Sequence, residues 1–231
     1  KIGKLTNRKV IEQWKHMAED MSGYESDDTT YSDFAIYDHL TLSRAVIVKD
    51  RNKPEYFTDN MIQTLPCVMF EEVDAKECGL LPSSPCTILK TTCPIPNIIK
   101  FVGINEQLGK NLDMVRWDRV NGKINSRIQS IREEPFFTFC TIGDKQWGYI
   151  LNHKYLKNGV ISAIFENPVE AAQFCGDKEA LCNPLELDFH TDYKLIDPIL
   201  KLAWNTILTT RRAANYDKNN DDRPDTGEVQ R

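Results

Sequence analysis

The stretch FFTFCTIGDKQWGYIL, residues 136–151, decides how we interpret this chain. Its two halves are short, apolar and rich in aromatic and β-branched residues, which is typical of β-strands. Gly143 and Asp144 between them are a strong two-residue hairpin signal, and Asn158-Gly159 gives a second one. The stretch therefore predicts antiparallel strand pairing in this part of the chain.

Similar runs continue outward on both sides, bounded by Pro, Gly, Asn and Asp. Together they make residues 61–165 a β-rich middle with the character of a meander. Residues 118–133 leave room for a turn of helix, and a short helix is expected over 168–174. The predicted strands are 61–73, 87–90, 98–102, 114–117, 136–142, 146–151 and 160–165.

Both ends of the chain carry apolar residues at helical spacing. We predict helices over residues 7–21, 30–49 and 192–214, the second capped by Thr30 and the third by Asp192. A short polar loop between the first two helices favours an antiparallel pair.

This order of elements predicts an α+β fold, in which a helical bundle from the N- and C-terminal helices packs with a small antiparallel β-sheet. One domain is expected over residues 1–212. The segment after Tyr216 has almost no apolar residue, so residues 215–231 are expected to be a flexible C-terminal tail.

Composition places the chain among ordinary globular proteins: 231 residues, 41% hydrophobic, 27% charged and a net charge of −5. No apolar run is long enough to predict a membrane span. The charge is uneven, because a basic N-terminal segment precedes an acidic one, an arrangement that suits head-to-tail contact between copies. An odd, scattered set of cysteines favours a reducing compartment over a disulfide framework: Cys67, Cys78, Cys86, Cys93, Cys140, Cys175 and Cys182.

The sequence predicts no catalytic, cofactor or metal site. Phosphate-binding glycine loops and the nucleophile elbow are missing, and neither the cysteines nor the four histidines have zinc-ligand spacing. The carboxylate pairs Glu71-Glu72 and Glu133-Glu134 lie at predicted strand ends, where adjacent residues face opposite sides. Neither pair is therefore expected to converge on one substrate bond.

The C-terminal tail leaves one question open. Its acidic and amide side chains match positions 1, 3, 5, 9 and 12 of an EF-hand loop, namely Asp217, Asn219, Asp221, Asp225 and Glu228. Asp222 occupies position 6, where the loop needs Gly, and Pro224 occupies position 8. Whether this segment ever binds a cation is not decided by the sequence.

Several segments, taken in order, resemble the structural proteins that form head-to-tail connector rings in short-tailed bacteriophages, especially crAss-like phages. The resemblance covers most of residues 11–210. It rests on IEQWKHMAED (11–20), DDTTYSDFAIYDHLTLSRAVIVKD (27–50), EEVDAKECGLLPSSPCTILKTTCPIPNIIKFVG (71–103), KNGVISAIFENPVEAAQFCG (157–176) and DYKLIDPILKLAWNTILTT (192–210).

The resemblance implies a virion structural protein at the head-to-tail interface, assembled in the host bacterial cytoplasm, with no catalytic residue, cofactor or metal. It would form a ring with itself below the portal protein, expected to be a dodecamer, extend the DNA channel and dock other ring or tail proteins. Residues 215–231 would reach the portal. Genomic DNA would pass through without sequence recognition, and no membrane partner is implied. The cysteine content and the basic N-terminus depart from the pattern and leave the position of the ring open.

Two alternatives remain beside this interpretation. The first is another phage role, as a collar, tail hub or baseplate component. The second is a small cytosolic enzyme or binding domain, in which Cys140 or Cys175 would be reactive.

Overall fold

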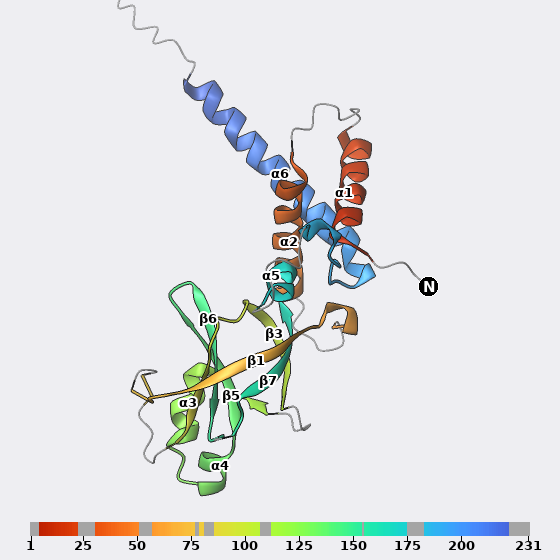
Figure 1. Cartoon of the computed structure of the whole chain (residues 1–231). Coiled ribbons are helices and arrows are strands. Elements are labelled where there is room, and N and C mark those ends of the chain that lie inside the picture. Colours follow the sequence, from red (N-terminus) through yellow and green to blue (C-terminus); the bar gives the residue numbers. More distant parts are fainter. Residues whose placement is uncertain are drawn as a thin grey trace, which may run out of the picture.

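The structure is a computed structural model that describes residues 5–22, 31–50, 57–76, 79–80, 86–106, 112–153, 155–174 and 183–221, with the backbone alone at 22, 106 and 211–221. Terminal helices gather at one end of the molecule and the sheet forms the other (Figure 1). The elements are α1 (Asn7–Ser22), α2 (Asp33–Asp50), the 3₁₀ turn η2 (Asp59–Met61), β1 (Gln63–Val73), β2 (Ile88–Thr91), β3 (Ile98–Glu106), β4 (Asp113–Met114), α3 (Trp117–Ile124), α4 (Gln129–Glu133), β5 (Phe136–Ile142), β6 (Lys145–Leu151), β7 (Asn158–Phe165), α5 (Pro168–Ala172), the 3₁₀ turn η4 (Pro184–Glu186) and α6 (Tyr193–Asp221).

The described strands form one seven-stranded mixed sheet in the order β3-β7-β1-β2-β6-β5-β4. Neighbouring strands are antiparallel except β4 and β5, which are parallel. The two edges approach each other, because the Leu112 amide just before β4 donates a hydrogen bond to the Ile104 carbonyl of β3 at 3.2 Å. Phe101 of β3 also stacks on Phe137 of β5, with ring centroids 5.0 Å apart. The sheet is therefore curled into a nearly closed barrel.

The predicted fold class is wrong. We expected a helical bundle with a small antiparallel sheet, whereas the main body is this seven-stranded mixed barrel. The difference comes from long-range pairing: β7 binds both β1 and β3, and β1 binds both β7 and β2. Residues Asn158 and Gly159 do not form the expected hairpin turn, because they pair with Met69 and Val68 of β1.

The barrel interior is filled by aromatic and branched aliphatic side chains. Gly148 of β6 makes room for one of them, because a Cβ atom there would lie 3.0 Å from Phe137 Cε2. The β5–β6 hairpin forms where it was predicted, and Gly143 in its turn has φ +65°, a conformation that glycine adopts without strain. The buried residues of the interior include Leu65, Val68, Ile104, Phe137, Ile150 and Ile161.

A β-bulge interrupts β1 at Pro66 and Cys67. The pairing with β7 shifts register between Leu65 and Val68, and Cys67 has φ +56°. Proline has no N–H to donate to the ladder, so it is accommodated at such irregularities. The bulge turns Pro66 and Cys67 toward solvent while Leu65 and Val68 stay buried.

Helices α1, α2 and α6 pack on one another at one end of the barrel, around a cluster that includes Trp14 and Ile199. Trp14 meets Trp204 edge to face, with ring centroids 5.6 Å apart. Helix α2 begins at Asp33, where the Ser32 hydroxyl accepts a hydrogen bond from the Ala35 amide at 3.2 Å; Thr30, the expected cap, lies outside the described residues.

Helix α6 is longer than predicted. Asp192 caps it through a hydrogen bond from the Lys194 amide to its carboxylate at 2.9 Å, as the sequence predicts. The helix then continues to Asp221 instead of ending at 214. Residues 215–221 are therefore helical rather than part of the expected tail, and residues 222–231 lie outside the described part of the chain.

Candidate functional site

Arg44 joins the helical layer to the barrel. This side chain of α2 is fully buried and donates hydrogen bonds to the carbonyls of His190 at 2.7 Å and Phe165 at 2.9 Å. Burial lowers the pKa of Arg44 to about 10, so the guanidinium stays charged near neutral pH. Arg44 therefore ties α2 to the end of β7 and to the segment that precedes α6.

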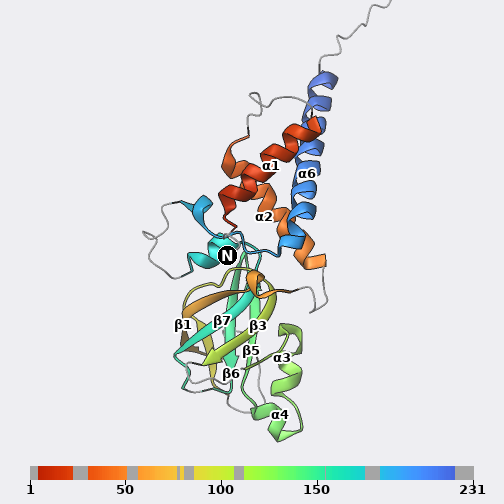
Figure 2. The same ribbon diagram turned by 90° about the vertical axis from the view of Figure 1, so that its right-hand side faces the viewer.

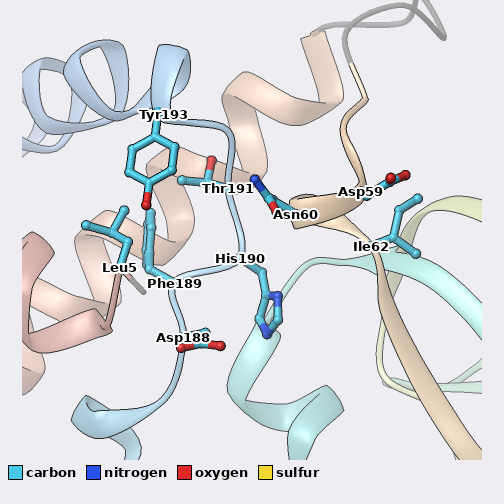
Figure 3. Close-up of a pocket in the computed structure, with 9 residues that line it drawn as sticks. All are labelled: Leu5, Asp59, Asn60, Ile62, Asp188, Phe189, His190, Thr191 and Tyr193. Carbon is cyan, nitrogen blue, oxygen red and sulfur yellow. The ribbon is translucent and has the colours of Figure 1, made fainter. Parts of the chain in front are cut away.

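An open cleft of about 490 Å³ lies beside this connection. Figure 3 shows its lining, with Leu5, Phe189 and Tyr193 on one side and Asp59 and Ile62 on the other. Thr191, which is 4% exposed, has a buried hydroxyl oxygen that meets no hydrogen-bond partner among the described residues. Because the cleft is bounded by η2 and by the segment leading into α6, we assign it to the joint between the two parts of the molecule.

The structure places both carboxylate pairs considered from the sequence, Glu71-Glu72 and Glu133-Glu134, at exposed positions. Glu71 and Glu72 are exposed near the end of β1. Glu134 lies in an ion pair with Lys123, at 2.8 Å between Oε2 and Nζ. Within the described ranges no group of three His, Cys, Asp or Glu side chains is placed to hold a metal ion.

The acidic C-terminal segment is only partly covered by the structure. Asp217, Asn219 and Asp221 lie in the helical backbone of α6, whereas an EF-hand loop wraps around its ion. Asp225 and Glu228 lie outside the described residues.

Two of the described thiols, Cys86 and Cys140, lie in surroundings that disfavour the thiolate. Burial raises the pKa of Cys140 and of Cys86, which lowers the thiolate fraction and is the opposite of what a catalytic thiol needs. Cys67 is exposed and Cys93 is partly buried, and both are free thiols. Cys78, Cys175 and Cys182 lie outside the described residues.

The basic residues of α1 are partly neutralised by acidic residues of the same chain. Arg8 lies 2.7 Å from Glu186 of η4, and Lys15 lies 2.6 Å from Asp33 of α2. These charges therefore contribute less to contact with another molecule than the sequence alone indicates.

Two surfaces with exposed apolar side chains distinguish the exterior. On α2, the apolar side chains Phe34, Leu42 and Val46 are 55%, 56% and 42% exposed. On the barrel, Met69 and Val102 are 58% and 50% exposed on the outer side of β1 and β3. Sequence reasoning placed the α2 residues on a helix but did not identify these surfaces, because exposure depends on how the strands and helices pack.

Contiguous exposed apolar surfaces are typical of the class of proteins that make contact with other proteins. The chain belongs to a family within that class, the phage tail ring protein 2 family of crAss-like phages, whose sequence profile matches residues 17–226. No curated protein matches the chain significantly.

The family membership confirms the resemblance and its general meaning: the chain is a bacteriophage structural protein of the tail, of the ring type, and a virion component. None of the helices in the described ranges has the length and apolar character needed to span a membrane.

Proposed function

We propose that the chain forms a ring from copies of itself in the phage head-to-tail connector, below the portal protein. The ring extends the DNA channel and offers a docking surface to the next tail component. We expect twelve copies, to match the symmetry of the portal, and assembly in the host cytoplasm before the ring enters the virion. The family membership supports the ring, and the shape of the chain supports an axial contact.

The main support for a contact along the ring axis is that α6 projects from the rest of the chain. The helix has 29 residues, which corresponds to a length of about 43 Å at 1.5 Å per residue. Figure 1 shows its C-terminal part extending away from α1, α2 and the barrel. Most helical stability in proteins comes from tertiary packing, so contact with a partner would stabilise the projecting part. We therefore assign residues 215–231 to portal binding.

The charge of the chain supports a channel role. The net charge of −5 gives an overall repulsion between the protein and the DNA phosphates. A ring that conducts DNA without sequence recognition needs such a weakly interacting surface.

The experiment is co-assembly with the portal protein of the same phage, followed by size-exclusion chromatography and negative-stain imaging. The full chain is expected to form a ring coaxial with the portal. A variant that lacks residues 215–231 is expected to lose the portal complex, whereas the control lacking only 229–231 retains it. Binding to another tail component but not to the portal would instead support a collar, hub or baseplate role.

A further inference from the structure

We infer that the outer face of strands β3, β7 and β1 receives the exposed stripe of α2 from the next copy of this chain in the ring. The inference rests on the proposed function only in taking the ring to consist of copies of this chain. It adds the two surfaces that meet and the direction of the contact.

The first surface, the outer sheet face, carries no charged side chain. The exposed Met69 and Asn158 are paired across β1 and β7, and the hydroxyls of Thr64 and Ser162 lie 3.3 Å apart. In a chain with 27% charged residues, a solvent-facing sheet surface without charge resembles the core of a protein interface, where charged residues are depleted. We define the outer sheet face as Thr64, Pro66, Cys67, Met69, Val102, Gly103, Asn105, Asn158, Val160 and Ser162.

The outer sheet face is also not covered by any of the described helices (Figure 2). Helix α3 packs on the other side of the barrel, where Val120 and Ile124 bury against Phe136 and Tyr149. The terminal helices and α5 lie at one end. Figure 2 looks onto β1, β7 and β3, and no described helix crosses them. Charged residues border the face at Lys100 of β3, at Glu71 of β1 and at the exposed Lys157 just before β7.

The second surface, the α2 stripe, consists of Phe34, Leu42 and Val46. Positions four apart lie above one another on a helix, and residues 34, 38, 42 and 46 are all exposed. Asp38 is the one charged member of this series, and it lies between Phe34 and Leu42. Helix α2 buries Ile36, Leu40 and Val48 on its inner side, so it is apolar on both sides, as helices enclosed by protein are.

A second copy is the occupant that fits both surfaces. A ring of identical chains closes through heterologous contacts, so each copy must present two different complementary surfaces. The outer sheet face has no charge to pair with a charged partner, and burying an unpaired charge is costly. The α2 stripe of the same chain supplies three apolar side chains and one acidic group, Asp38, which lies between Phe34 and Leu42.

The test uses one charged substitution in each surface and one matched control. Val102→Glu changes the outer sheet face, Leu42→Glu changes the α2 stripe, and Ile142→Glu places the same charge on a comparably exposed residue of β5, 52% exposed, outside both surfaces. Analytical ultracentrifugation is expected to show rings for the wild type and Ile142→Glu, and monomers for the other two. All three variants should keep the wild-type melting temperature of the monomer.

Mixing the two disrupted variants determines the direction of the contact. Each retains one intact surface, so equal amounts of Val102→Glu and Leu42→Glu are expected to form a 1:1 dimer that cannot close. Rings from either variant alone, a Leu42→Glu homodimer, or a mixture that stays monomeric would overturn the inference. A wild type that never self-associates would overturn it as well, even if that protein binds the portal. If the variants and their mixture behave as expected but the wild-type ring does not bind the portal, the proposed function is overturned and the inferred contact between copies is not.

Cys67 provides a readout that needs no disruptive variant. It is exposed on the outer sheet face, so alkylation followed by peptide mass spectrometry is expected to label it in the diluted monomer and to lose that label in the ring. Equal labelling of Cys67 in both states would contradict the inference.

Discussion

At the scale of single residues, Arg44 connects the helical layer to the barrel. Its buried guanidinium satisfies backbone carbonyls at the end of β7 and before α6, two segments far apart in the sequence. Removing it leaves those acceptors without their donor and opens a cavity between the helical layer and the barrel.

Arg44→Ala is therefore expected to lower the free energy of unfolding by about 3–5 kcal/mol. Lys49→Ala is the control, because the ion pair of Lys49 with Glu166 is at the surface and such pairs contribute about 1 kcal/mol or less. Urea unfolding of both variants measures the difference. A loss below about 1 kcal/mol for Arg44→Ala would show that Arg44 does not join the two parts.

Two glycines test the packing of the barrel. Gly148→Ala forces a methyl group against Phe137 and Thr91 and is expected to cost about 1–3 kcal/mol. Gly122 lies in α3, and a methyl group added there would meet no atom within 4 Å, so Gly122→Ala is expected to stabilise by about 0.5–1 kcal/mol. Thermal unfolding that gives both variants the same sign would contradict the close contact at Gly148.

The described thiols are expected to differ in reactivity. Burial raises the pKa of Cys86 and Cys140, so each is less ionised at pH 8 than an unperturbed thiol would be, and access is also restricted. Cys67 of the monomer should therefore be alkylated faster than either. Time-resolved alkylation with peptide mapping measures this order, and a fastest reaction at Cys140 would revive the reactive-thiol alternative.

At the scale of elements, the sequence predicted correctly those helices and turns that are determined by contacts between residues near one another in the chain. The apolar spacing over 7–21 corresponds to α1, and Gly143-Asp144 to the β5–β6 turn. The run 114–117 is different: only Asp113–Met114 forms a strand, and Trp117 begins α3, where its ring packs on Tyr149 with centroids 5.2 Å apart. Whether this run forms a strand or a helix depends on packing against a residue distant in the sequence, which a local pattern does not reveal.

The projecting half of α6 makes its own prediction. Ile207 is 2% exposed and belongs to the buried cluster of the helical layer, whereas the C-terminal part of α6 projects away from the body (Figure 1). Deleting residues 215–231 is therefore expected to change the melting temperature by less than about 2 °C, which is no more than a loss of about 1 kcal/mol gives in a chain of this size. Deleting residues 205–231 removes Ile207 and serves as the destabilising control. A large drop after the shorter deletion would show that the projecting half packs on the monomer.

At the scale of the whole molecule, the arrangement of parts could not be predicted from the sequence. The β-rich middle was identified, but the closure of its strands into a barrel depends on pairs such as Gln63 with Ala163 and Phe101 with Ala163, which no local pattern specifies. The uncharged outer sheet face was missed for the same reason, because Val102 and Met69 become neighbours of one surface only once β7 lies between β3 and β1.

The barrel, the helical layer and the projecting α6 together give the chain side surfaces for copies of itself and an end for an axial partner. We assign the outer sheet face and the α2 stripe to contacts within the ring, and α6 to the portal side. The proposed function and the proposed contact between copies both depend on this division of surfaces.

Electron microscopy of the purified chain assembled with its portal protein examines all of these surfaces in one experiment. We expect closed rings in end views, stacked coaxially on the portal in side views, with α6 at the portal side and the outer sheet face of each copy covered by the next. Single copies attached separately to the portal, or rings whose copies leave the β3, β7 and β1 face open, would contradict this division of surfaces.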